Sequence, residues 1–372
     1  MRVVIDCFKQ IKGEGKSIGI YNVALSLVQN LAKEQKHSDN KIIKSYEIVI
    51  LGNEYNEKDF NIEGTRFISV KNYNPKNKIH CILWELFGVI YVCKKLKADK
   101  IIFPRGYCAL IHPIGDIVLI HDLIPFYYNE HFPGVFRKLE NAYIMNRLKT
   151  SARSAKQVIT ISEASKRDIM KYCGVDEEKI TVIYNACNAI SFSEEKARQE
   201  KPYICAVTSD LPHKNAKGIL LSYKKYCTIT ENPLRLVVIG ISDTSCCELP
   251  EYINSNITCY KFIKDNMEMY RLINNSTVFI FLSLIEGFGL PPIEAMQLRV
   301  PVICSDVSSL PEVTGNAAVL VNPYFPDVIA EKLDSLVKNQ GMQKELVNRG
   351  IENIKRFSWE TRSKLYWKEI IK

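Results

Sequence analysis

Two carboxylates flank a short turn in the stretch LSLIEGFGLPPIEAM (282–296), with Glu286 before the turn and Glu294 after it. The preceding run TVFIFLS (277–283) has the continuous apolar pattern of a buried strand, and IEAM begins a helix. If the turn binds an anion, two ionised carboxylates beside it suit only neutral hydroxyl donors, such as those of sugars and riboses. Alternatively, Glu294 is a first-turn acid at the helix dipole and Glu286 a solvated loop residue. The stretch by itself leaves both interpretations open.

The turn between the two carboxylates has the composition of a ligand-binding loop. Gly287 and Gly289 allow the backbone to approach a ligand closely, and two prolines follow in the first helical turn, where a missing amide hydrogen is tolerated. The amides of Phe288, Gly289 and Leu290 are expected at the carboxyl edge of a parallel sheet, beside a helix N-terminus. Phosphate groups bind at such positions in α/β domains.

Short β-branched runs alternate with helical periodicities along most of the chain, which is typical of parallel sheets covered by helices. A charged stretch of weak periodicity, residues 189–202, interrupts the alternation and is interpreted as a linker. We therefore expect an α/β fold with domains at 1–188 and 203–356, followed by a helical segment at 357–372. The strands are predicted at 2–7, 46–51, 100–103, 116–122, 157–162, 203–207, 234–240, 257–263, 277–283 and 300–306.

The final segment, FSWETRSKLYWKEIIK, begins with Ser358 as a candidate N-cap and continues with a hydrophobic stripe. Trp359, Tyr366 and Trp367 give this stripe a large aromatic area. The segment is therefore predicted to be a helix that covers another apolar surface.

The chain of 372 residues carries 50 Lys and Arg against 41 Asp and Glu, a formal net charge of +9. This excess fits a phosphate-bearing small molecule, a nucleic acid or an anionic membrane surface. No nucleic acid is expected as a partner, because the sequence contains no recognisable module and no interleaving of aromatic and basic residues. Basic residues concentrate in the first half, either on solvated helix faces or against anionic lipid. They are Lys94, Lys95, Lys97, Lys100, Arg137, Lys138, Arg147, Lys149, Arg153 and Lys156.

The twelve cysteines show no metal-ligand spacing, and several stand in apolar runs, which indicates buried thiols in a reducing compartment. The beginning, MRVVIDCF, lacks the pattern of a signal peptide, so a cytoplasmic protein is expected. The longest apolar stretch, residues 81–93, contains Glu85 and is too short to span a bilayer core of about 30 Å. It is either a core helix or an interfacial one.

The loop QIKGEGKSIG (10–19) contains Gly-Lys-Ser, the last three residues of a nucleotide phosphate loop. Gln10 stands where that motif needs its first glycine, and the glycine spacing does not match a dinucleotide-binding loop either. There remains a glycine-rich loop that feeds a helix near Gly19. Its amides could face an anion or a sugar, or the loop is only a flexible turn.

The run LSLIEGFGLPPIEAMQLRVPVICSDVSSLPEV (282–313) resembles the signature of glycosyltransferase family 4, glutamate pair included. The resemblance implies the GT-B fold, in which two Rossmann-like domains face a cleft and a C-terminal helix crosses back to the first domain. It also implies that this helix couples closure of the cleft to donor binding. Four further segments are similar to other blocks of the family: SIGIYNVALSL (17–27), IVLIHDLIPFYYNEHFP (117–133), QVITISEASKRDIMKYCGVDEEKITVIYNACN (157–188) and VTSDLPHKN (207–215).

The resemblance assigns expected roles to the residues around the turn. Glu286 would face the transferred sugar, Glu294 would hold ribose hydroxyls, and the amides of 287–290 would touch the diphosphate or the sugar. Lys214 would supply a cation to the diphosphate, and its point charge suits phosphate. Ser209 is expected among the residues that bind the donor.

Two residues from the blocks of the first domain complete the expected site. His121, at a strand end and followed by aspartate, would lie near the anomeric carbon and position the sugar without binding metal; a histidine at a strand end can also be purely structural. Gly19 would approach the donor from the N-terminal glycine loop.

The sequence departs from the family pattern at three places. Thr208-Ser209 stands where many members carry an arginine beside glycine, and His213 replaces the common arginine before the lysine. Lys214 is therefore expected to share its task with an unidentified cation. Ala186 stands where glycine is usual at the interdomain hinge.

The implied activity is retaining, metal-independent transfer of a hexose from a nucleotide-diphosphate sugar, with GDP-mannose or a UDP-sugar favoured. A helix N-terminus and Lys214 can stabilise the leaving diphosphate without a divalent ion, so no cofactor and no metal are expected. The implied acceptor is a glycan or a lipid-diphosphate-linked sugar in the synthesis of capsule, O-antigen or lipopolysaccharide. The location would be cytoplasmic, or peripheral at the inner face of an anionic membrane.

Two other functions fit the same features. A nucleotide-sugar epimerase of this architecture would act on the donor without an acceptor, and product analysis with donor alone separates it from a transferase. A sugar-nucleotide-binding protein without activity is suggested only by the altered Thr208-Ser209 position. Tight donor binding without turnover would identify it.

Overall fold

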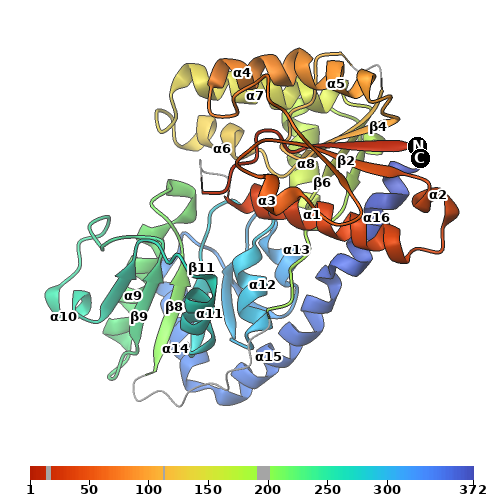
Figure 1. Cartoon of the computed structure of the whole chain (residues 1–372). Coiled ribbons are helices and arrows are strands. Elements are labelled where there is room, and N and C mark those ends of the chain that lie inside the picture. Colours follow the sequence, from red (N-terminus) through yellow and green to blue (C-terminus); the bar gives the residue numbers. More distant parts are fainter. Residues whose placement is uncertain (14–17, 112–113, 191–201) are drawn as a thin grey trace. The chain divides into compact units, whose positions relative to one another are not determined.

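The computed structural model describes residues 1–13, 18–111, 114–190 and 202–372. The chain divides into two compact units (Figure 1): the first comprises Met1–Ala186 with Trp359–Lys372, and the second comprises Cys187–Ser358. Most of the predicted linker lies outside the described residues, as do residues 14–17 of the glycine-rich loop.

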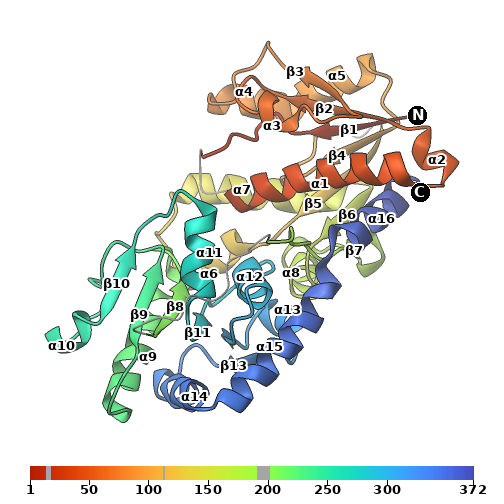
Figure 2. The same cartoon turned by 60° about the horizontal axis from the view of Figure 1, so that its bottom comes forward.

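The described part of the first unit contains a seven-stranded parallel sheet in the order β3-β2-β1-β4-β5-β6-β7. Helices cover both of its faces (Figure 2). The strands are β1 (Arg2–Asp6), β2 (Glu47–Gly52), β3 (Arg66–Ser69), β4 (Lys100–Phe103), β5 (Gly115–Ile120), β6 (Gln157–Thr160) and β7 (Ile180–Val182). The helices are α1 (Ile18–His37), α2 (Lys41–Lys44), α3 (Glu57–Phe60), α4 (Lys78–Leu83), the π-helix η1 (Trp84–Gly88), α5 (Val89–Lys95), α6 (Ile124–His131), α7 (Lys138–Ser154), α8 (Glu163–Cys173), the short η2 (Glu177–Lys179) and α16 (Trp359–Ile370).

The described part of the second unit contains a six-stranded parallel sheet in the order β10-β9-β8-β11-β12-β13. Its strands are β8 (Tyr203–Val207), β9 (Arg235–Ile239), β10 (Ile257–Tyr260), β11 (Val278–Phe281), β12 (Val302–Ser305) and β13 (Ala318–Val321). Its helices are η3 (Pro212–Lys214), α9 (Ala216–Ile229), α10 (Glu251–Asn254), α11 (Asn266–Asn274), α12 (Leu290–Gln297), α13 (Leu310–Thr314), α14 (Pro326–Lys338), α15 (Gln340–Ile354) and η4 (Lys355–Phe357).

In each sheet, successive strands are added first on one side of the first strand and then on the other side. In the first unit, β1 is followed by strands on one side and β4 then starts the other side; in the second unit the same reversal occurs between β8 and β11. At such a switch point the loops at the carboxyl ends of two adjacent strands diverge and leave a crevice, where open α/β sheets bind ligands. The strand order therefore predicts one ligand crevice in each unit, between β1 and β4 in the first and between β8 and β11 in the second.

The final helix packs on the first unit. Trp367 of α16 is fully buried, its Nε1 donates to the Leu31 carbonyl of α1 at 3.0 Å, and its ring lies 5.7 Å from that of Tyr46. This confirms that the aromatic stripe covers an apolar surface and that the C-terminal helix crosses back to the first domain.

The apolar stretch 81–93, predicted to be a core helix or an interfacial one, lies in α4, the π-turn η1 and α5. It presents one buried face, which includes Trp84, Val89 and Cys93, and one exposed face, which includes Leu83 and Phe87. The core and interfacial alternatives thus describe two faces of the same segment.

Candidate active site

The crevice between β8 and β11 brings Lys214 and Glu286 together. Lys214 ends η3 in the loop after β8, and Glu286 lies in the loop after β11. Because the two strands are adjacent, residues 72 positions apart in sequence come within contact: Lys214 Nζ lies 2.6 Å from Glu286 Oε1. The Lys214 side chain is 26% exposed and that of Glu286 is 10% exposed, so an incoming ligand can reach the lysine.

The turn after Glu286 is fixed by backbone geometry that only glycine adopts without strain. Gly289 has φ of +101°, and a Cβ at this position would lie 2.5 Å from Leu310 Cδ2. Two serines from the loop after β12 hold the turn: Ser308 Oγ donates to the Glu286 carbonyl at 2.7 Å, and Ser309 Oγ donates to the Phe288 carbonyl at 2.9 Å. Both serines lie in the quoted signature, but sequence reasoning gave them no role.

The amino end of α12 begins immediately after this turn. Pro291 and Pro292 carry no N–H, so the first helical turn offers few backbone donors. Within the part of the chain that the structure describes, the amides of Gly289 and Leu290 donate no hydrogen bond. These two amides and the positive end of the helix dipole are suited to an anion.

Glu294 lies one turn into α12 and is half-buried. Burial raises the pKa of its carboxyl group to about 7, and a hydrogen bond from the Tyr270 hydroxyl, 3.5 Å from Glu294 Oε1, opposes that rise. Tyr270 belongs to α11, and sequence reasoning did not identify it. A half-buried carboxylate with a neighbouring hydroxyl can accept hydrogen bonds from a neutral ligand.

The three residues near Lys214 at which the sequence departs from the family pattern lie in the loop after β8. Burial, reinforced by the charge of Lys214, lowers the pKa of His213 to about 4, so this histidine is neutral near pH 7 and is not a second cation. Thr208 Oγ1 donates to the Lys214 carbonyl at 2.7 Å, and Ser209 Oγ accepts a hydrogen bond from the Leu211 amide at 3.3 Å. Thr208 and Ser209 therefore shape the turn that presents Lys214.

The remaining two predicted residues belong to the first unit. His121 follows β5 and is buried; because a carbonyl oxygen can only accept, its Nε2 carries a proton and donates to the Pro104 carbonyl at 2.8 Å. Burial lowers the pKa of His121, which favours the neutral ring with a lone pair on Nδ1. Gly19 lies in the first turn of α1, is exposed, and has no heavy atom within 4 Å of the Cβ position.

Comparisons with known proteins agree with this architecture. The family model described as glycosyl transferases group 1 matches residues 188–354, and the model of glycosyltransferase family 4 matches residues 23–189. The two matches together span both parallel-sheet units. The chain is a glycosyltransferase.

Individual relatives of this glycosyltransferase come from surface polysaccharide synthesis. It is 29% identical to the O-antigen chain mannosyltransferase RfbU of Salmonella typhimurium, over 68% of this chain and 70% of that protein. It is 27% identical to the O-antigen chain mannosyltransferase B of Escherichia coli, over 66% of this chain and 67% of that protein. Among solved structures, a sucrose-phosphate synthase of Thermosynechococcus elongatus aligns with a TM-score of 0.72 and 16% identity, covering 100% of this chain and 99% of that one. The structural match shows the shared GT-B fold.

In this glycosyltransferase the second unit brings together Lys214, Glu286 and the turn 287–290, with Glu294 one helical turn further along α12. His121 and Gly19 stand at the carboxyl edge of the other sheet. The roles given to these residues stay predictions.

The described residues contain neither a candidate metal site nor a membrane-spanning helix. No group of three or more His, Cys, Asp or Glu side chains there is arranged to hold a metal ion. No helix in the described ranges is both long enough and apolar enough to cross a membrane.

Proposed function

We propose that this glycosyltransferase moves a hexose from a nucleotide-diphosphate sugar to a glycan or lipid-linked sugar with retention of anomeric configuration and without a metal ion. The observation that carries the proposal is the Lys214–Glu286 ion pair beside the amino end of α12. A cation, two unpartnered amides and a helix dipole favour a diphosphate, and a carboxylate at the same place favours the hydroxyls of the sugar attached to it.

Donor binding would rearrange this pair. Lys214 exchanges Glu286 for the diphosphate, and Glu286 then accepts a hydrogen bond from a hydroxyl of the transferred sugar. Lys214 and the amino end of α12 stabilise the charge that develops on the leaving group. Glu294, with Tyr270 beside it, holds the ribose hydroxyls.

The transfer step needs no nucleophile from the protein. The bond between the anomeric carbon and the phosphate oxygen breaks, and the bond from the acceptor oxygen to the same carbon forms on the same face. The acceptor hydroxyl gives its proton to the leaving phosphate, which carries both electrons of the broken bond. His121 orients the sugar through Nδ1, because its Nε2 hydrogen is committed to Pro104.

The sugar favoured by the two relatives is mannose, since both are named mannosyltransferases of the O-antigen chain. GDP-mannose is therefore the first donor to test, with UDP-sugars next. The corresponding process is the synthesis of a surface polysaccharide, on a glycan or lipid-diphosphate-linked acceptor.

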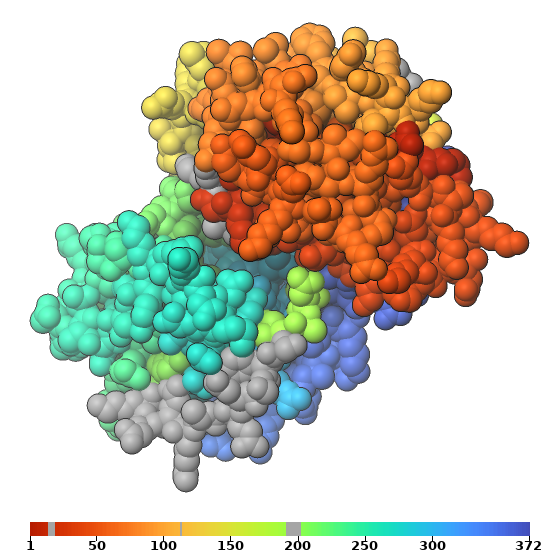
Figure 3. Space-filling model, viewed as in Figure 1, coloured from red at the N-terminus to blue at the C-terminus, as the bar shows by residue number. Residues whose placement is uncertain are grey.

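The exposed face of α4, η1 and α5 supports contact with an anionic membrane. Four large apolar residues at four-residue steps, Ile79, Leu83, Phe87 and Tyr91, are between 43% and 71% exposed. The segment that carries them, coloured orange, is at the surface of the first unit in Figure 3. Its neighbours include four exposed lysines, and an apolar stripe with a basic rim is the pattern of an interfacial helix. These lysines are Lys71, Lys78, Lys94 and Lys95.

Co-sedimentation with vesicles tests the membrane contact. The protein should bind vesicles of phosphatidylcholine mixed with phosphatidylglycerol and not vesicles of phosphatidylcholine alone, because the lysines need anionic headgroups. Phe87→Ser should weaken that binding, whereas Phe262→Ser, at a 71% exposed phenylalanine of the second unit, should not. Equal binding of all three proteins, or no binding, would remove this part of the proposal.

A thermal-shift screen against uridine, guanosine, adenosine and thymidine diphosphate sugars tests the function itself. A donor that binds the folded state raises Tm with increasing ligand concentration. The bound donor is then incubated with and without acceptor glycans, and the products are analysed. Isomerised donor without acceptor would indicate an epimerase, and tight binding without turnover would indicate an inactive binding protein.

A further inference from the structure

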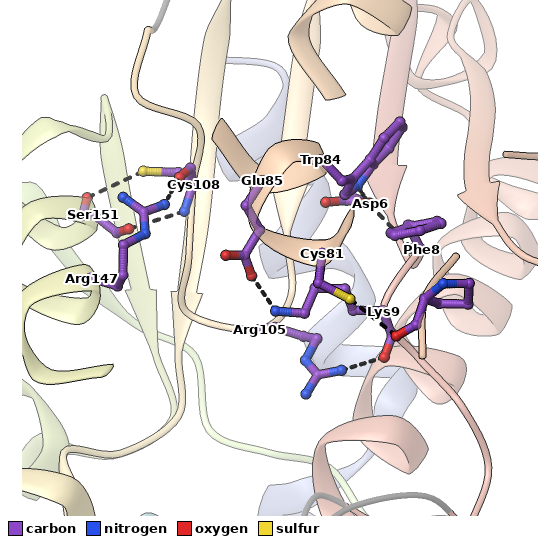
Figure 4. A network of polar contacts seen from close by, with 11 residues as sticks. Asp6, Phe8, Lys9, Cys81, Trp84, Glu85, Arg105, Cys108, Arg147 and Ser151 are labelled. Carbon is purple, nitrogen blue, oxygen red and sulfur yellow. Dashed lines mark hydrogen bonds and ion pairs between the residues drawn. The ribbon is translucent and has the colours of Figure 1, made fainter. Parts of the chain in front are cut away.

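The crevice of the first unit, between β1 and β4, holds a polar cluster that the donor site does not use (Figure 4). Lys9 follows β1, Arg105 follows β4, and Glu85 projects from η1. Lys9 Nζ forms an ion pair with Glu85 Oε1, and Arg105 Nη1 donates to the Lys9 carbonyl. Three segments far apart in sequence thus meet at the carboxyl edge of the sheet, where this fold binds ligands.

The burial of these groups is unusual for a surface ion pair. The Glu85 side chain is 6% exposed and that of Lys9 is 23% exposed. Glu85 belongs to a π-turn within a helical segment, and π-turns occur frequently at functional sites. Removing a carboxylate this far from water is unfavourable unless its hydrogen bonds are satisfied.

The cluster retains unused hydrogen-bonding capacity. Guanidinium carries five N–H donors, and within the described residues Arg105 uses only Nη1. Tyr107, half-buried with its ring 5.6 Å from Lys9 Nζ, makes no hydrogen bond through its hydroxyl to any described residue. Neither side chain is among the buried groups that lack a partner, so these donors are accessible to solvent and available to a ligand.

The charges of the cluster balance. Lys9 and Arg105 supply two positive charges, Glu85 supplies one negative charge, and Asp6, which accepts a hydrogen bond from the Trp84 indole at 3.0 Å, supplies a second. Burial raises the pKa of Asp6 to about 6, so this carboxyl is mostly ionised at pH 7. A neutral set of donors and acceptors beside an aromatic ring suits a polyhydroxylated, uncharged ligand better than an anion.

The cluster is connected to His121. The Pro104 carbonyl that accepts the His121 Nε2 hydrogen immediately precedes Arg105, and the charge of Arg105 contributes to lowering the pKa of His121. A ligand held by Arg105 would therefore lie beside the residue expected to orient the transferred sugar.

We propose that Lys9, Glu85, Arg105 and Tyr107 form the subsite for the uncharged sugar residue of the acceptor. Glu85 accepts a hydrogen bond from one acceptor hydroxyl, Arg105 donates to the oxygen of another, and Tyr107 contributes its hydroxyl and its ring. Lys9 holds Glu85 in place through their ion pair. This subsite rests on the proposed function, since only a transferase needs an acceptor.

Saturation-transfer NMR with four p-nitrophenyl glycosides, those of mannose, glucose, galactose and N-acetylglucosamine, tests the subsite in the full chain. At least one glycoside should bind the wild-type protein. Arg105→Gln and Glu85→Gln should weaken that binding by about tenfold or more, as expected for loss of one charge-assisted hydrogen bond. Tyr107→Phe removes only a hydroxyl, keeps the packing and should weaken binding by a smaller factor.

Lys36→Met serves as the matched control, because Lys36 forms an exposed ion pair with Glu63 on the same unit. It should bind the glycoside as the wild type does, and all variants should keep the wild-type thermal shift with the nucleotide sugar. Unchanged affinity in Arg105→Gln and Tyr107→Phe, or no binding of any glycoside to wild type, would overturn the subsite. Failure of the proposed function is distinct, because it would appear as absence of any thermal shift with nucleotide sugars in the wild type.

Discussion

Lys214 Nζ and Glu286 Oε1 lie 2.6 Å apart in the crevice between β8 and β11, so two residues expected to bind different parts of one donor neutralise each other in its absence. The pair keeps a partly buried carboxylate and a partly buried ammonium satisfied until a ligand arrives. In the proposed function, exchange of this partner for a diphosphate would link the charge of the leaving group to the release of Glu286 toward the sugar.

Lys214→Met should lower the transfer rate by about 10²-fold, because the developing charge on the diphosphate loses its cation. Affinity for the nucleoside diphosphate should also fall. Lys225→Met is the matched control, since Lys225 forms an exposed ion pair with Asp327 in the same unit. Steady-state kinetics and calorimetric titration with the nucleoside diphosphate measure both effects, and wild-type kinetics in Lys214→Met would contradict the assignment.

Replacement of each glutamate by alanine should change a different kinetic constant. Glu294→Ala removes the expected acceptor for ribose hydroxyls and should raise KM for the donor with little change in kcat. Glu286→Ala should mainly lower kcat, because its contact is with the transferred sugar. Donor saturation curves distinguish the two patterns; if both variants transferred sugar at the wild-type rate, the site assignment would collapse.

The pH dependence of donor binding should follow the ionisation of the Glu294 carboxyl group. Its pKa of about 7 means that the carboxylate, the form that accepts two hydroxyl hydrogen bonds, predominates only above neutral pH. Affinity for the nucleoside diphosphate should therefore rise between pH 6 and pH 8, as calorimetric titration would record. Glu294→Gln should lose this rise while keeping any contribution from titration of the phosphate itself.

The same group should affect stability in the opposite direction. A carboxyl group whose pKa is higher in the folded protein than in the unfolded chain contributes stability at low pH that is lost as pH rises through about 7. The Tm of the wild type relative to Glu294→Gln should therefore fall between pH 5 and pH 8. A constant difference across that range would contradict the raised pKa.

Trp367→Ala should destabilise the first unit by roughly 3–5 kcal/mol, since it empties a fully buried site and removes the hydrogen bond to the Leu31 carbonyl. Urea denaturation followed by circular dichroism measures the loss. Tyr252→Ala, at a side chain that is 66% exposed, should change the free energy of unfolding by less than about 0.5 kcal/mol. Comparable effects of the two substitutions would mean that α16 does not stabilise the unit.

The sequence periodicities correctly located β1, β2, β4 to β6 and β8 to β12, because the apolar pattern of a buried strand lies in consecutive residues. The short strands β3, β7 and β13 were not predicted, since their residues are only partly buried for most of their length. The turn 287–290 could also be predicted from the sequence, because glycine and proline act locally on the backbone.

The partners of the site residues depended on tertiary structure. The contact of Lys214 with Glu286, the bonds from Ser308 and Ser309 to the turn, and the hydrogen bond from Tyr270 to Glu294 all join separate loops or helices. Which loops meet is decided by the order of strands across the sheet, and that order is set by packing of distant segments.

The sequence by itself determined the α/β alternation, the two carboxylates around a glycine turn and the family resemblance, because each is encoded in residues near one another along the chain. Only the tertiary structure decided that Lys214 pairs with Glu286, that His213 is buried and neutral, and that Lys9, Glu85 and Arg105 share one crevice. Pairing, burial and charge depend on which distant segments the two sheets place side by side, so they are properties of the fold and not of any single stretch.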